Sequence, residues 1–112
     1  MKIGIDIVKV SRFRNKEYHS NQKFYENIFS KNEINYCLKY KDPYPHFAGR
    51  FAAKEAVIKA TNTKTKLNQI TINQKKNGLE IKIKNILKPK IMVSISHEKE
   101  YSVAMSVDFS NI

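Results

Sequence analysis

The order of the predicted elements places this chain in the α+β class. A strand pattern opens the chain, helical patterns fill its middle, and alternating strand patterns fill its C-terminal half. Because the later strands follow one another without intervening helices, antiparallel hairpins are expected instead of a doubly wound parallel sheet. We expect residues 1–112 to form a single domain, in which an antiparallel sheet packs against one long helix and several shorter helices.

The first strand is predicted over residues 2–10, where three isoleucines alternate with Gly4, Asp6 and Val8. Both faces of this strand look apolar, so we expect it at the centre of the sheet, buried on both sides. Asp6 shares its face with valines, and a buried carboxylate costs free energy unless something pairs with it. Asp6 therefore either caps a neighbouring backbone group or belongs to a site.

Shorter helical patterns separate this strand from the long helix. Ser11 is expected to cap a short helix, and residues 23–29 carry aromatic and isoleucine side chains at helical spacing. Ser30 followed by Glu33 forms a capping box, which opens a helix with Cys37 as a small core residue. The prolines in the segment 42–45 end this helix and prepare the entry to the next one.

The long helix is predicted from Phe47 to Ala60, and one acid stands in its apolar face. At 100° per residue, the phenylalanines and several alanines of this run share one side. Glu55 falls inside that apolar arc and needs a partner, for which Lys59 one turn later is a candidate. Arg50 and Lys54 flank the arc, so the helix combines one nearly buried anion with several cations.

The C-terminal half is expected to form hairpins. Each of its apolar runs alternates with period two, and Lys75 to Gly78 supplies a turn between the first two. His97 begins the turn between the last two. The predicted strands cover residues 69–73, 79–83, 91–95 and 101–109.

Composition narrows the classes of partner. The chain has 21 Lys and Arg against 10 Asp and Glu, a formal charge of +11, which predicts an anionic partner without choosing among nucleic acid, anionic lipid, a phosphorylated cofactor and an acidic protein. The single cysteine excludes an internal disulfide and fits a reducing compartment. No run approaches the length of a membrane span, and the start of the chain reads as a strand, so a cytoplasmic protein without membrane contact is expected.

The two misplaced acids are the strongest chemical signal. The glycines form no phosphate-binding loop, the histidines have no zinc spacing, and Ser96 and His97 point to opposite faces of a strand, which disfavours a hydrolase triad. Asp6 and Glu55 would both face the layer between strand and helix, where a shared Mg²⁺ removes their repulsion. The alternative is that Glu55 pairs with Lys59 and Asp6 finds a backbone donor; spacing alone leaves both open.

Three motifs together resemble a known family, holo-acyl-carrier-protein synthase, the small phosphopantetheinyl transferase. The motifs occur in the right order and span nearly the whole chain. They are Gly4-Ile5-Asp6-Ile7, the Gly-Arg-Phe-Ala-Ala-Lys-Glu-Ala core of Phe47 to Ala60, and Ser94-Ile95-Ser96-His97. The chain departs from the family pattern at residues 61–66, which lack the usual glycines, and at the hairpin 77–80, which reads Asn-Gly-Leu-Glu.

The resemblance implies a 4'-phosphopantetheinyl transferase-like fold and transfer of 4'-phosphopantetheine from coenzyme A to a serine of apo acyl carrier protein. This Mg²⁺-dependent reaction releases adenosine 3',5'-bisphosphate and supports fatty acid biosynthesis. Asp6 and Glu55 match the family's metal ligands, and Lys59 matches a lysine near the transferred phosphate. Glu55, or a water on the metal, would take the serine proton.

The resemblance also assigns the binding of coenzyme A and of the carrier protein. Arg50, Lys54 and His97 match residues that hold the nucleotide and its 3'-phosphate, with Ser96 in the same motif as His97. Gly78 lies in the hairpin that covers coenzyme A. Arg12 matches an arginine that docks the acidic helix of the carrier protein. The resemblance further implies a compact homotrimer whose sites are shared between neighbouring subunits.

Two other classes of function remain as rivals at this stage. A basic nucleic-acid-binding module is suggested by the charge of +11 and by 6 Tyr and 6 Phe, but it needs exposed aromatic side chains on a basic strand face. A small assembly subunit without a ligand would leave Asp6 and Glu55 unexplained.

Overall fold

The computed structural model describes residues 1–111 and confirms an α+β protein with antiparallel strands. Ile112, the last residue of the expected domain, lies outside the described residues. In chain order the elements, with η for a 3-10 helix, are β1 (Lys2–Lys9), α1 (Ser11–Arg14), η1 (Tyr18–Ser20), α2 (Gln22–Glu26), α3 (Lys31–Leu38), α4 (Tyr44–Thr61), η2 (Leu67–Gln69), β2 (Ile70–Lys75), β3 (Gly78–Ile83), β4 (Ile86–Leu87), β5 (Ile91–His97) and β6 (Tyr101–Asp108).

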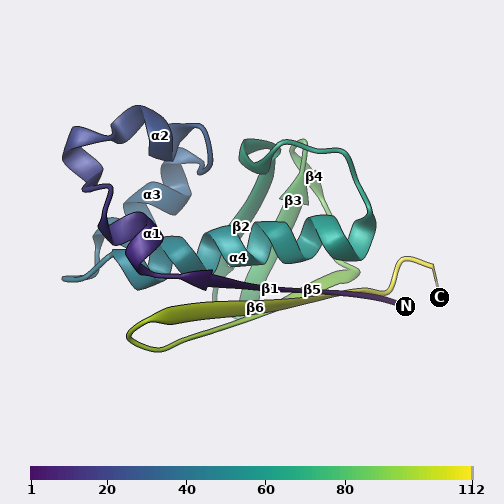
Figure 1. The fold of residues 1–112 in the computed structure, drawn as a ribbon. Coiled ribbons are helices and arrows are strands. Elements are labelled where there is room, and N and C mark those ends of the chain that lie inside the picture. The colour runs from purple at the N-terminus through teal and green to yellow at the C-terminus, as the bar shows by residue number, and fades with distance from the viewer. Residues whose placement is uncertain (112) are drawn as a thin grey trace.

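The strands form two sheets, and α4 lies between them (Figure 1). One sheet has the strand order β1-β6-β5 and the other the order β2-β3-β4, with every pair antiparallel. The short helices α1, α2 and α3 gather at the N-terminal end of α4, and the start of β1 lies beside the end of β6 at its far end (Figure 1). The expected hairpins β2–β3 and β5–β6 are confirmed.

The position of α4 between two sheets explains a wrong prediction about its faces. The sequence pattern suggested one apolar side, but α4 contacts β1, β5 and β6 on one side and β2 on the other. A helix covered on several sides buries most of its surface. Arg50 and Lys54, expected beside the apolar arc, are therefore buried, whereas Glu55 is only half-buried.

The first strand was expected at the centre of a sheet, and this is wrong. β1 is an edge strand that pairs with β6 alone within residues 1–111. Its inner face packs on α4, but Ile3, Ile5 and Ile7 on its outer face are 58%, 58% and 64% exposed. An apolar strand face is thus left open in the single chain.

Gly4 explains how β1 can lie directly on α4. A Cβ at this position would overlap the carbonyl oxygen of Ala56 and lie 2.7 Å from the amide nitrogen of Ala60. Only a glycine lets the strand backbone meet the helix backbone there. This close approach fixes the position of Asp6, two residues further along the same face.

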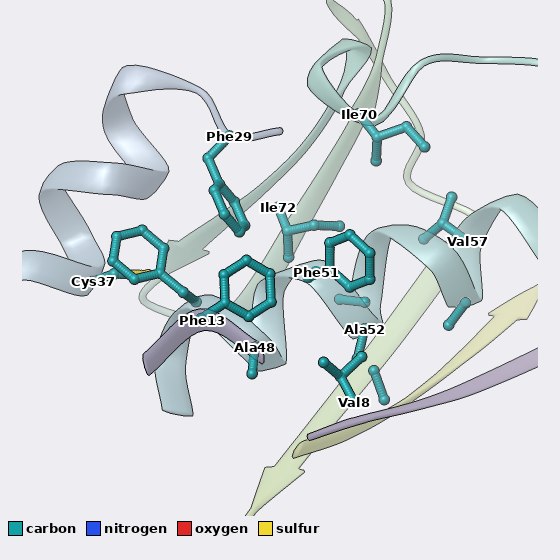
Figure 2. Close-up of a cluster of buried hydrophobic side chains, with 14 of the residues drawn as sticks. Val8, Phe13, Phe29, Cys37, Ala48, Phe51, Ala52, Val57, Ile70 and Ile72 are labelled. Carbon is teal, nitrogen blue, oxygen red and sulfur yellow. The ribbon is translucent and has the colours of Figure 1, made fainter. Parts of the chain in front are cut away.

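The hydrophobic core fills the space between α4 and its neighbours. Figure 2 shows Val8, Ala52 and Phe51 meeting across the layer between β1 and α4, with Ile72 approaching from the second sheet. Phe13 on α1 contacts several aromatic rings, including that of Phe51 at a centroid distance of 5.5 Å. The core therefore anchors the short helices to the long one.

Local sequence signals were confirmed at one helix start and failed at another. Ser30 and Glu33 form the predicted capping box of α3, and Cys37 is buried as expected. Ser11 is not an N-cap, because α1 already includes it. The prediction also missed β4, which pairs with β3. The two strands are connected by a turn at Lys84 and Asn85, both in the left-handed region with φ of 52° and 66°.

Within residues 1–111, no helix combines the length and the hydrophobicity needed to cross a bilayer.

Candidate active site

The Asp6 carboxylate meets a lysine from α4. Lys59 Nζ donates to Asp6 Oδ1 at 3.1 Å and to the carbonyl oxygen of Ile5 at 2.8 Å. The side chain of Asp6 is 19% exposed and that of Lys59 is 52% exposed, so the pair lies at the edge of the layer between β1 and α4, where a ligand can reach it. Among residues 1–111 no backbone group donates to the Asp6 carboxylate, and Lys59 pairs with Asp6 and not with Glu55, so the alternative of two separate local partners is not observed.

Glu55 lies one helical turn before Lys59 on the same side of α4. The Lys59 contact with Asp6 thus brings both carboxylates to one side of the helix. Glu55 is half-buried, and within residues 1–111 it forms no ion pair. Its carboxylate oxygens remain available to an external ligand.

Asp6, Glu55 and Lys59 are here called the carboxylate strip, and its two carboxylates have the chemistry to bind a magnesium ion. Mg²⁺ takes oxygen ligands and typically uses one or two carboxylates, with phosphate oxygens and waters in the remaining positions. Asp6 keeps its second carboxylate oxygen free of Lys59, and Glu55 supplies another carboxylate. Among residues 1–111, no cluster of three or more His, Cys, Asp or Glu side chains could hold a metal ion.

A second candidate region lies on the other side of α4. It is a hollow of about 380 Å³, here called the Arg50 hollow, between α3, α4, the start of β3 and β5. Three of the predicted cofactor residues, Arg50, Gly78 and His97, line it. Gly78 has a φ of 120°, which a residue with a side chain rarely adopts, and it forms part of the wall of the hollow.

Arg50 is the most unusual side chain of this hollow. Only 5% of its surface is exposed, and among residues 1–111 its Nε and Nη2 atoms have no hydrogen-bond partner. Its guanidinium lies 4.4 Å from the centroid of the Tyr36 ring. A buried guanidinium with unpaired donors costs free energy, which makes it a ready binding group for an anion.

The sequence alone did not identify Tyr36 and His46 as members of this hollow. His46 stands four positions before Arg50, so the spacing for one helix face was present in the sequence. The signal was hidden because His46 lies before the predicted start of the long helix, whereas α4 begins at Tyr44.

Lys54 requires a correction. It was expected beside the nucleotide, but its ammonium is fully buried and donates to Glu33 Oε1 at 2.7 Å and to the carbonyl oxygens of Ile28 and Leu67 at 2.7 and 3.1 Å. All three ammonium protons are therefore used inside the protein. Burial lowers the pKa of Lys54, and the Glu33 carboxylate opposes this effect.

Glu33 completes the same structural network. Its Oε1 accepts from the Ser30 amide in the capping box at 2.8 Å, and its Oε2 accepts from the Ile72 amide at 2.7 Å. This buried pair joins α3, α4 and β2. Lys54 therefore supports the fold, and its ammonium is not available to a ligand.

Ser96 and Arg12 lie outside both regions. The register pairs Ser96 with Val103 on the outer face of its sheet, so its side chain points away from the Arg50 hollow. Arg12 is exposed on α1, with its guanidinium 4.8 Å from the centroid of the Phe51 ring. The neighbouring Arg14 is held by Asp42 through two hydrogen bonds of 3.0 and 2.9 Å.

The two candidate regions lie at opposite edges of one sheet. Asp6 on β1 pairs with Ala104 on β6, which in turn pairs with Ile95 on β5, beside the hollow. Two strand spacings of about 10 Å in total separate the edges. Arg50 and Glu55 also differ by about 140° around the helix axis, so the carboxylates and the hollow of one chain face different directions.

The aromatic side chains do not form a platform for nucleic acid. Phe13, Tyr25, Phe29, Phe47 and Phe51 are buried in the core. Among the large hydrophobic side chains of residues 1–111, Tyr40 and Tyr101 are the exposed aromatics; Tyr40 follows the end of α3, and Tyr101 begins β6. The basic charge thus lacks the exposed aromatic strip that a single-strand binder requires.

Comparison with known proteins identifies the class. The model of the 4'-phosphopantetheinyl transferase superfamily matches residues 2–106. This chain therefore belongs to that superfamily and is an enzyme of that class.

Within this class the similarity is to one kind of enzyme. A holo-[acyl-carrier-protein] synthase of Thermodesulfovibrio yellowstonii is 42% identical over 108 residues, covering 94% of this chain and 95% of that protein. The Bacillus anthracis holo-(acyl-carrier-protein) synthase, solved in complex with CoA (3',5'-ADP), is 32% identical with a TM-score of 0.75, over 94% of this chain and 92% of that chain. The Helicobacter pylori enzyme, in complex with coenzyme A, is 29% identical with a TM-score of 0.77, over 95% and 98%. The family resemblance drawn from three motifs is confirmed.

Proposed function

We propose that this chain transfers the 4'-phosphopantetheine group of coenzyme A to a serine of an apo acyl carrier protein and releases adenosine 3',5'-bisphosphate. The observation that carries the proposal is the meeting of Asp6 and Lys59 one turn from Glu55, in a chain similar to carrier-protein synthases over nearly its whole length. In this proposal residues 1–112 act as one domain, in the cytoplasm, and the product supports fatty acid biosynthesis.

The carboxylate strip, with Asp6 on β1 and Glu55 and Lys59 on α4, carries out the chemistry in this proposal. The serine oxygen forms a bond to the phosphorus that bears the pantetheine arm, and the pyrophosphate bond to the nucleotide breaks. Asp6 and Glu55 would hold Mg²⁺, which supplies charge neutralisation on the pyrophosphate when bound. Lys59, which is 52% exposed, places a cation beside the transferred phosphate, and Glu55 is positioned to take the serine proton.

The Arg50 hollow carries nucleotide binding. Arg50 offers unpaired donors to a phosphate, His97 lies on the wall formed by β5, and Gly78 brings the hairpin backbone to its rim. The similar Bacillus anthracis enzyme was solved in complex with CoA (3',5'-ADP), which supports a nucleotide of this kind as the ligand. Arg12, exposed on α1 near the N-terminal end of α4, would dock the acidic carrier protein.

The full site requires more than one copy of the chain, in our proposal a homotrimer. The carboxylate strip and the Arg50 hollow lie at opposite edges of the sheet, so a coenzyme bound to both must bridge two subunits. The outer face of β1 and β6 is apolar and open, with Ile5, Ile7 and Met105 at 58%, 64% and 45% exposure. Such a face favours contact with another copy of the chain.

The test is a mass-spectrometric assay of an apo carrier protein with coenzyme A and Mg²⁺. The wild type is expected to add one phosphopantetheine mass, and no gain would overturn the proposed function. Asp6→Asn and Glu55→Gln are expected to reduce the rate at least about 100-fold while the circular dichroism spectrum is retained. Glu26→Gln, an exposed acid on α2, is the matched control and should remain active. Full activity in both site variants would refute the metal assignment.

A further inference from the structure

The Arg50 hollow contains a chain of aromatic contacts beyond the residues given a role above. The Tyr36 ring lies against the Arg50 guanidinium, and the Tyr36 hydroxyl is 2.9 Å from the Tyr40 hydroxyl. The Tyr40 ring stacks on His46, with centroids 3.5 Å apart and planes at 13°. His46 in turn meets His97 edge-on at 4.9 Å. The imidazole of His46 is thus held in a fixed orientation on the wall of the hollow.

The charges around His46 make this wall suitable for an anion. Within the described residues, no carboxylate lines the hollow, whereas Arg50, His46 and His97 all do. The groups that face His46 are Tyr40 and Tyr36 from the α3 side, Arg50 on its own helix, His97 on β5 and Asp42 before α4. The Asp42 carboxylate is already paired with Arg14 and does not neutralise the hollow.

The protonation of His46 responds to this environment. Burial lowers the pKa of His46, and the nearby His97 and Arg50 lower it further, while Asp42 raises it. The imidazole is therefore predominantly neutral near pH 7 in the free protein. An anion in the hollow favours the charged form and raises this pKa, so binding takes up a proton.

We infer that His46 is a specificity-determining residue that recognises the 3'-phosphate of coenzyme A together with Arg50, as a protonated donor held by Tyr40. This inference rests on the proposed function for the identity of the ligand. It gives the hollow two roles: Arg50 supplies a permanent charge, and His46 adds a second charge when a phosphate monoester is present. Affinity for a coenzyme with this phosphate increases as pH falls from 8 to 6.5, because protonating His46 then costs less free energy.

The test compares coenzyme A with 3'-dephospho-coenzyme A, which differs by that phosphate alone. Calorimetric titration at pH 6.5 and pH 8, in buffers of different ionisation enthalpy, gives affinity and proton uptake together. His46→Gln is expected to weaken coenzyme A binding about 10- to 100-fold at pH 6.5, the loss of one charge-assisted hydrogen bond. Binding of the dephospho form should not change. His19→Gln, an exposed histidine on η1, is the matched control.

The outcomes separate this inference from the proposed function. Two results for His46→Gln would overturn the role of His46 and leave the transferase proposal standing. One is an equal loss of affinity for both coenzymes. The other is wild-type proton uptake together with wild-type discrimination between coenzyme A and its dephospho form. Failure of the wild type to bind either coenzyme would overturn both. NMR titration of the His46 and His97 imidazole resonances, with and without adenosine 3',5'-bisphosphate, shows which histidine takes up the proton. A His46 titration that the ligand does not change would also refute the inference.

Discussion

Replacing Lys54 by methionine is expected to lower the free energy of unfolding by about 3–5 kcal/mol. Methionine fills a similar volume but donates no hydrogen bond. Glu33 Oε1 loses the ammonium at 2.7 Å in a buried site, and the part-buried carbonyl oxygens of Ile28 and Leu67 lose their donor. A domain is stabilised by about 5–15 kcal/mol in total, so this single change removes a large fraction.

Urea unfolding followed by far-ultraviolet circular dichroism, at one fixed protein concentration, measures the effect. Lys59→Met on the same helix is the matched control, because its partly exposed ion pair with Asp6 contributes below about 1 kcal/mol. The double variant Lys54→Met/Glu33→Gln removes the stranded carboxylate charge and should be more stable than Lys54→Met, with a coupling of about 1–3 kcal/mol.

One result would refute this reasoning. If Lys54→Met changed the unfolding free energy by less than about 1 kcal/mol but weakened coenzyme A binding, the lysine would be a ligand and its buried contacts would be unimportant for stability. The structure predicts the reverse, because the ammonium has no exposed surface.

Two further predictions concern the sheet that packs on α4. Gly4→Ala should destabilise the protein by about 3 kcal/mol, at the upper end of the range for overpacking, because the added methyl group overlaps the Ala56 carbonyl. Lys9→Ala on the same strand is the control. Equal unfolding midpoints for the two variants would contradict the close approach. Ile5→Asp should convert a trimer into a monomer in size-exclusion chromatography with light scattering, whereas Ile86→Asp, equally exposed on β4, should not; a monomeric wild type would refute the proposed assembly.

Sequence reasoning succeeded where a signal is confined to neighbouring positions. The capping box of Ser30 and Glu33 needs only the start of one helix, and it is formed as predicted. The β2–β3 and β5–β6 hairpins follow from alternation on either side of a short turn. The motif around Glu55 was specific enough to indicate the family before any contact was known, and the family match confirmed it.

The same reasoning failed where burial depends on a distant element. Periodicity described α4 as a helix with one apolar side, because a pattern cannot show that a second sheet covers the other side. Lys54 was therefore expected beside a ligand, although Glu33, 21 positions away, encloses it in the core. The isoleucines of β1 were expected to be buried, but they lie on the outer face of the sheet, where no element among residues 1–111 covers them.

The sequence by itself thus determined the order of the elements, the family, and the importance of Asp6 and Glu55 as acids among apolar residues. The tertiary structure decided how these acids are used. Lys59 meets Asp6 across 53 positions of sequence, and the close approach of Gly4 to α4 sets that meeting. Spacing records which side chains share a face of one element, but the partner of a charge depends on which backbone packs against that face.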